Sequence, residues 1–217
     1  TATPPTTATT TPFDAKGNSF PAELLPAKIE RNGVTFELLP ASGGKANALT
    51  ARGQEIQLPA GEYTRVHVIA ASVAGDQPAT FGLGGQSSRS VAIQDWGGMI
   101  GQWDNRVWNK KQVPVPTRPG APEPGPGQPP RTRTELEVTS VTPAFRKPES
   151  VAWFASHHHT KEGKDAAYAY SYLFAYDFNL PPGAKSIRLP DNDSIRIFAI
   201  SVSSERPAGA AATQATK

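Results

Sequence analysis

The feature that most constrains the fold is a series of short alternating stretches, each interrupted by glycine, proline, asparagine or aspartate. In residues 63–73, YTRVHVIAASV, successive side chains fall on opposite faces of an extended chain. About ten such stretches run through the sequence, and no segment combines a 3.6-residue period with helix caps. This spacing predicts an all-β fold, a β-sandwich or jelly roll, rather than alternating strands and helices.

Two proline-rich segments and a tail of small residues frame the predicted domain. Residues 1–12, TATPPTTATTTP, hold no large side chain, so burial cannot offset the entropy of ordering them. Residues 113–134 predict a long Pro/Gly-rich inserted loop between two strands; the alternative is a linker between two domains. The predicted organisation is a linker, one β-sandwich domain containing that insertion, and a disordered tail, at residues 1–12, 13–204 and 205–217. Because the chain begins with Thr1 and a linker, we expect a further domain upstream.

Composition and charge exclude several functional classes. The net charge of +3 comes from 22 basic and 19 acidic residues that are well mixed, so no basic face for nucleic-acid phosphates is expected. The absence of cysteine excludes disulfide scaffolds and thiol catalysis. No apolar run reaches the length of a membrane span. We therefore expect neither a nucleic-acid partner nor a membrane-spanning segment.

Three of the four tryptophans fall within residues 91–108, VAIQDWGGMIGQWDNRVW, among glycines and polar side chains. An indole face can cover the apolar C–H face of a sugar ring, and polar neighbours can hydrogen-bond its hydroxyls. The competing interpretation is that the indoles pack a core with the aliphatic residues beside them. The predicted carbohydrate-binding residues are Trp96, Trp103, Asp104, Asn105, Arg106, His157 and His159.

The histidine run SHHHT at residues 156–160 is a second candidate site. If this segment is a strand, His157 and His159 share one face and His158 points to the other. Two such imidazoles can chelate zinc, but the nearby sequence supplies no third or fourth Cys or His ligand. The alternative is that the imidazoles line the edge of a polar pocket and exchange hydrogen bonds there.

Paired carboxylates of the kind used in glycoside hydrolysis are represented by Asp95 and Asp104 in the tryptophan-rich segment. Both also fit ordinary roles, because Asp95 would bond turn amides and Asp104 would pair with Arg106.

Two oxygen-rich turns, at residues 13–20 and 189–194, are candidates for a structural calcium ion. The candidate ligands are Asp14, Asn18, Asp191 and Asp193. Ordinary turn chemistry is the alternative explanation for both segments. The expected function requires no cofactor.

Several long motifs carry a family resemblance, among them FDAKGNSFPAELLP at residues 13–26, IQDWGGMIGQWDNRVW at 93–108 and ESVAWFASHHHT at 149–160. Together they resemble the C-terminal β-sandwich accessory domain of microbial alpha-mannosidase-like glycoside hydrolases. The resemblance implies a galactose-binding-like or jelly-roll module joined to an upstream catalytic domain, in an extracellular or periplasmic setting. The zinc site and aspartate nucleophile of those catalytic domains have no matching motif in this sequence.

The leading hypothesis is a non-catalytic, carbohydrate-associated module that binds glycan or supports the catalytic domain of the same polypeptide. One alternative is a stand-alone glycan-cleaving enzyme that uses Asp95, Asp104 or the histidine run. Another is a structural or adhesive interaction domain whose proline-rich insertion is the recognition element.

Overall fold

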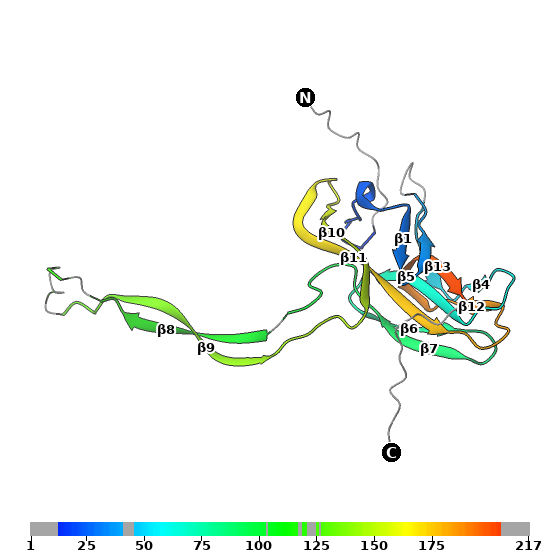
Figure 1. Cartoon of the computed structure of the whole chain (residues 1–217). Helices are drawn as coiled ribbons and strands as arrows, with labels where there is room; N and C mark the ends of the chain where they lie inside the picture. The colour runs from blue at the N-terminus through cyan, green and yellow to red at the C-terminus, as the bar shows by residue number, and fades with distance from the viewer. Residues whose placement is uncertain are drawn as a thin grey trace, which may run out of the picture. The chain divides into compact units, whose positions relative to one another are not determined.

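The computed structural model describes residues 13–40, 46–102, 104–116, 119–120, 125 and 127–204 (Figure 1). Within these ranges the chain forms thirteen β-strands and one short 3₁₀ helix, η1 (Ala22–Leu24). No helix in the described part of the chain is long and apolar enough to cross a membrane. The predicted linker at 1–12, the predicted tail at 205–217 and Trp103 lie outside the described residues.

Two antiparallel sheets form the main body of the fold. The larger has the order β10–β11–β5–β13–β3, with bounds Ser150–His159, Asp165–Asn179, Arg65–Ser72, Asp191–Ser203 and Leu49–Arg52. The smaller has the order β4–β12–β6–β7, with bounds Glu55–Gln57, Ser186–Arg188, Gln77–Gly82 and Ser88–Ile93. A separate hairpin pairs β1 (Lys28–Arg31) with β2 (Val34–Glu37). The predicted all-β sandwich is thereby confirmed.

The main core lies between the two sheets. Alternate residues of β5, Val66 and Val68 among them, face this core and are fully buried. Phe81 from β6 and Ile187 from β12 cover them from the smaller sheet. Two sheets that each turn one apolar face inward make the two-layer arrangement expected of a sandwich.

A second core covers the opposite face of the larger sheet. Ile69 and Ala71 of β5 contribute to it, together with Phe36 from β2, and Phe20 and Trp96 from connecting segments. β5 is therefore buried on both faces, and all of its residues from Val66 to Ser72 are buried. Burial on both sides explains why this strand is apolar at successive positions instead of alternating with polar residues.

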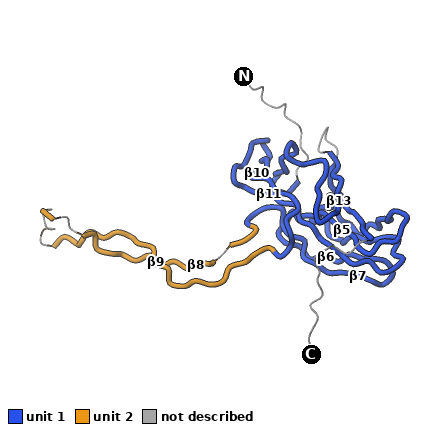
Figure 2. The backbone as a smooth tube through the Cα atoms, viewed as in Figure 1, with its two compact units in different colours: residues 1–99, 148–217 blue, residues 100–147 orange. Residues whose placement is uncertain are grey.

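Residues 100–147 form a compact unit of their own, and residues 1–99 and 148–217 form the other (Figure 2). The smaller unit is built on one long hairpin, in which β8 (Asp104–Pro114) pairs only with β9 (Thr132–Pro143). Every residue of β9 is exposed, as are most residues of β8. The Pro/Gly-rich insertion expected at 113–134 falls between these two strands and overlaps their ends.

Candidate functional site

Trp96 lies inside the second core rather than on the surface. Its side chain is 4% exposed, and its ring centroid lies 4.9 Å from that of Phe20 and 5.1 Å from that of Phe13. The backbone of Trp96 donates to the carbonyl of Ser72 and accepts from the N–H of Tyr172, which fixes the residue between two strands. Trp96 therefore packs the core and offers no face to a sugar, which matches the competing interpretation for this residue.

The polar residues predicted to bind hydroxyls beside it lie on β8, in the smaller unit. Arg106 donates to Asp104 Oδ2 from Nε at 3.0 Å and from Nη2 at 2.9 Å. Asn105 accepts a hydrogen bond from the side chain of Gln102 at 2.8 Å. Asp95 accepts from the backbone N–H groups of Gly75 and Gly97. These are the ordinary turn and ion-pair roles that the sequence offered as the alternative.

The histidine run contributes to a cluster that also contains two carboxylates. His157 and His159 come from β10, Glu23 from η1 and Asp165 from the first position of β11. The Glu23 Oε1 atom lies 3.7 Å from His157 Nε2 and 3.2 Å from His159 Nε2. Asp165 Oδ1 lies 3.8 Å and 3.3 Å from the same two nitrogens. We call these four residues the imidazole–carboxylate cluster.

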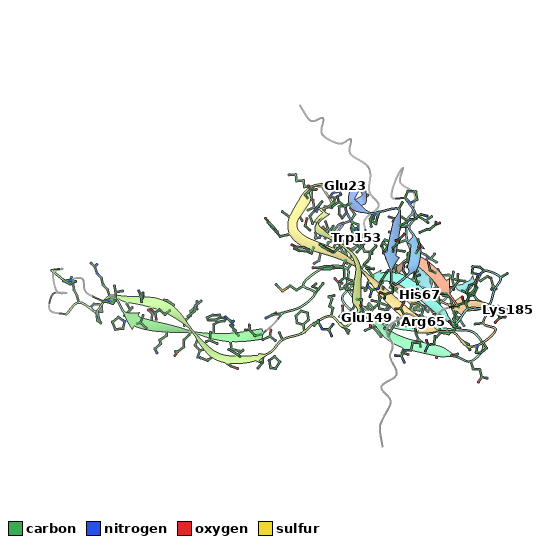
Figure 3. All side chains as sticks on the ribbon, viewed as in Figure 1. Glu23, Arg65, His67, Glu149, Trp153 and Lys185 are labelled. Carbon is green, nitrogen blue, oxygen red and sulfur yellow. The ribbon has the colours of Figure 1, made fainter. Side chains whose placement is uncertain are left out.

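The backbone explains how Glu23 reaches the histidines from so far away in the sequence. Ser19 and His159 exchange two backbone hydrogen bonds of 2.9 Å, so the segment that precedes η1 runs against the end of β10. Figure 3 shows Glu23 beside the curved β10–β11 hairpin. Glu23 was missed in the sequence because only this long-range bridge, and no local spacing, connects it to the histidines.

His158 turns away from that cluster, as the strand alternation predicts. Its ring centroid lies 5.3 Å from that of Trp96. Burial is the main cause that lowers the pKa of His158, with an opposing effect from Asp14. A lowered pKa keeps this imidazole neutral near pH 7, so it behaves as a packing residue.

Three neighbouring aromatic side chains on the same hairpin, two of them exposed, form what we call the aromatic row: Phe154, Tyr170 and Tyr172. The Phe154 and Tyr170 ring centroids lie 6.5 Å apart, and the rings of Tyr170 and Tyr172 are stacked at 6.2 Å. Phe154 is 59% exposed and Tyr170 is 38% exposed, whereas Tyr172 is buried. The only sequence signal for the row was the tyrosine at every second position in YAYSY, residues 168–172. This spacing is equally typical of an ordinary strand.

A bulge in β11 exposes a further tyrosine next to the row. The register between β10 and β11 shifts between Ala155 and His157, opposite residues 168–170. Tyr168 has φ +60° and is 85% exposed. A positive φ is unfavourable for a bulky residue, and such strain together with a bulge is found often at functional sites.

A chain of polar side chains centred on one buried histidine crosses three neighbouring strands of the larger sheet. His67 of β5 is 3% exposed, and its Nδ1 lies 2.6 Å from Asp177 Oδ1 of β11. Its Nε2 lies 2.9 Å from Ser203 Oγ of β13. Because a carboxylate only accepts, Nδ1 carries the proton, and in the neutral form of the ring Nε2 accepts from Ser203. We call these three residues the His67 relay.

The pKa values of two acids, one in the relay and one near it, are shifted. The hydrogen bond from His67 is the main cause that holds the pKa of Asp177 below its ordinary value. Burial, and then the charge of Asp177, raise the pKa of Glu149. Figure 3 labels His67 and Glu149 on the larger unit. The relay joins residues of three distant segments, so no local motif reveals it.

Two of the predicted calcium ligands, Asp14 and Asn18, are engaged in contacts within their own turn. Asp14 Oδ1 accepts from the backbone N–H groups of Lys16 and Asn18, and the Asn18 amide donates to Asp14 Oδ2. The backbone of Asp191 is paired with that of Arg52 in the sheet, and the backbone carbonyl of Asp193 accepts from Arg196, so these two contacts leave the carboxylates of both residues unassigned. Across the described ranges, the group of acidic and histidine side chains whose ligand atoms converge within 4.8 Å is Glu23, His157 and His159.

Comparison with known proteins adds a family match. A family model described as AziU2-like beta-sandwich domain matches residues 1–206. No curated protein matches the chain significantly.

Proposed function

This chain belongs to the AziU2-like β-sandwich domain family, and from that premise we propose that it is a non-catalytic carbohydrate-binding module. The observation that carries the proposal is the aromatic row on the β10–β11 hairpin. The three rings follow one another along the hairpin, and two of them are open to solvent. Their apolar faces can cover the C–H faces of successive sugar rings in a glycan. The tyrosine hydroxyls can donate to and accept from sugar hydroxyls beside them.

The proposal moves the sugar site away from the tryptophan-rich segment. Trp96 is buried, and Arg106 donates two hydrogen bonds to Asp104. His157 and His159 face carboxylates of the imidazole–carboxylate cluster. The exposed aromatic faces of the larger unit are those of Phe154, Tyr168 and Tyr170.

The proposal also includes a partner and a location. Following the resemblance seen in the sequence, we propose that the module serves a glycoside hydrolase of alpha-mannosidase type, outside the cell or in the periplasm. The matching family description names a fold and no ligand or enzyme. Each stacked ring contributes about 1 kcal/mol, so binding of a short glycan should be weak.

Affinity electrophoresis in gels containing mannan, galactan or xylan tests the sugar proposal. We expect the chain to be retarded by one of these polysaccharides and Tyr170→Ala to lose the retardation. Trp108→Ala is the matched control, because Trp108 is 48% exposed but lies on β8 of the smaller unit. Absence of retardation in all three gels, or equal loss in both variants, would refute sugar binding by the row.

A second candidate function, hydrolysis through a nucleophilic serine, is favoured by the His67 relay. The Ser203 Oγ to His67 Nε2 distance of 2.9 Å and the His67 Nδ1 to Asp177 distance of 2.6 Å match the order nucleophile, base and carboxylate. Ser203 also lines a cavity of about 470 Å³ together with residues of β2, β4 and β13.

Labelling with a fluorophosphonate probe distinguishes this second candidate. We expect a reactive Ser203 to be labelled in the native chain and Ser203→Ala to abolish the label. Ser201→Ala is the control, because Ser201 lies two residues away and lines the same cavity but donates to the carbonyl of Thr35. An unlabelled native chain would leave the relay with a purely structural role.

A further inference from the structure

We propose that the imidazole–carboxylate cluster is a zinc-binding site, formed by Glu23, His157, His159 and Asp165. This site is separate from the aromatic row and from the His67 relay. Its four side chains come from η1, β10 and β11, and the two imidazoles present Nε2 to the carboxylates.

The two separations from His159 match ligand atoms of a shared cation, and the two from His157 are longer. The four separations between an imidazole Nε2 and a carboxylate oxygen are 3.7, 3.2, 3.8 and 3.3 Å. A tetrahedral zinc ion with ligands at about 2.0–2.1 Å would have ligand atoms about 3.3–3.4 Å apart. Direct N–H···O hydrogen bonds have a most common length of about 2.9–3.0 Å, shorter than all four separations.

The ligand types identify the class of metal. Two imidazole nitrogens with two carboxylate oxygens form a mixed N/O set, which suits zinc and related transition metals. Calcium and magnesium prefer oxygen ligands throughout. Two carboxylates also balance the charge of a divalent ion.

The surroundings favour a structural rather than a catalytic ion. Glu23, His157 and His159 bring their ligand atoms within 4.8 Å of one another, and Asp165 Oδ1, 3.3 Å from His159 Nε2, is the candidate fourth ligand. Four protein ligands would fill a tetrahedral coordination sphere, whereas catalytic zinc keeps one position open for water. The His157 and His159 side chains are each 18% exposed, so their rings are largely held in place by the protein. The backbone hydrogen bonds between Ser19 and His159 already hold the segment leading to η1 against β10. Zinc would therefore fasten η1 to the β10–β11 hairpin.

Isothermal titration of the metal-free chain with zinc chloride tests the site. We expect one zinc ion to bind per chain, and cobalt(II) to give the intense visible absorption of a tetrahedral complex. Loss of a ligand in His159→Ala or Glu23→Gln should weaken zinc binding by at least about 100-fold, the upper range for loss of a mere outer-shell partner. Zinc should also raise the melting temperature of the native chain, and not that of His159→Ala.

Glu162→Gln is the matched control, because Glu162 is an exposed acid in the turn of the same hairpin. This variant should bind zinc as the native chain does. Asp165→Asn gives a second ligand variant in case His159→Ala does not fold. A chain that binds no zinc, that prefers calcium, or that keeps its zinc affinity in Glu23→Gln and Asp165→Asn would overturn the assignment. Zinc binding and retardation by polysaccharide are measured in separate experiments, so failure of one proposal does not affect the test of the other.

Discussion

At the scale of single residues, His67 shows how the sheet accommodates a buried imidazole. Both ring nitrogens have partners on the neighbouring strands, Asp177 on one side and Ser203 on the other. A buried polar group without such partners would cost about 1–3 kcal/mol. The relay therefore stabilises the buried imidazole of His67 whether or not Ser203 reacts.

Asp177→Asn tests this contribution through its pH dependence. The folded pKa of Asp177 is lowered, so its carboxylate stabilises the fold above the ordinary carboxyl pKa of about 4, and this stabilisation is lost as pH falls through the lower folded value. We expect Asp177→Asn to lose about 1 kcal/mol at pH 7, a small value because the carboxylate is 35% exposed. Urea unfolding from pH 7 to pH 3 should show a weaker loss of stability with acid in the variant.

Glu62→Gln is the control for that series, because Glu62 is an exposed acid outside the strands and outside the His67 relay. Its unfolding free energy should follow the native curve. An Asp177→Asn curve parallel to the native one, at every pH, would contradict the assigned role of the carboxylate.

At the scale of elements, β5 and the β8–β9 hairpin are opposite cases. β5 is paired on both edges, by β11 and β13, and is buried on both faces. β8 and β9 are paired only with each other, and a two-stranded hairpin is marginally stable in water. Exposed apolar side chains occur on both strands, including Val107, Trp108, Leu136 and Val141.

Hydrogen exchange followed by mass spectrometry should separate these two elements. Amides of β8 and β9 should exchange through local opening, whereas those of β5 should require global unfolding. We expect protection factors to differ by several orders of magnitude. Protection of β8–β9 equal to that of β5 would mean that the hairpin is covered in solution. If this protection increased with protein concentration, the covering partner would be a second copy of the chain.

Strands in which apolar and polar residues alternate could be predicted from the sequence. The contacts between strands far apart in the sequence could not. The stretch 63–73 predicted β5, which spans Arg65–Ser72, and GVTFELLP at 33–40 predicted β2, which spans Val34–Glu37. By contrast, Asp104, Asn105 and Arg106 were predicted to bind sugar, and the structure places them at the start of strand β8, Asp104–Pro114. Strand identity depends on local periodicity, but partner choice and register depend on packing.

The same limit applies to the candidate sites. Alternation along β10 correctly grouped His157 with His159 and separated His158. The acids that face them are contributed by η1 and by the start of β11, and the register that brings them together is set by tertiary packing. In the tryptophan-rich segment, Trp96 was predicted to bind sugar and is buried. Local composition cannot distinguish a buried indole from an exposed one.

At the scale of the whole molecule, the larger unit contains both sheets, both cores, the aromatic row and the imidazole–carboxylate cluster. The smaller unit begins and ends in adjacent backbone. Gly101 and Arg146 form an antiparallel bridge, and Lys147 donates to the carbonyl of Ile100 at 2.8 Å. The larger unit should therefore fold without the hairpin.

Replacing residues 102–145 with Asn-Gly tests this independence. An Asn-Gly turn is the favoured two-residue connection between antiparallel partners, and shortening a loop lowers the entropy cost of closing it. We expect cooperative unfolding with a free energy within about 1 kcal/mol of the native value, because the change lies outside both cores. Tryptophan emission should move to shorter wavelength, since the exposed Trp108 is removed while the buried Trp96 remains. Retained zinc and glycan binding would locate both sites in the larger unit. Loss of cooperative unfolding would instead show that its cores depend on the hairpin.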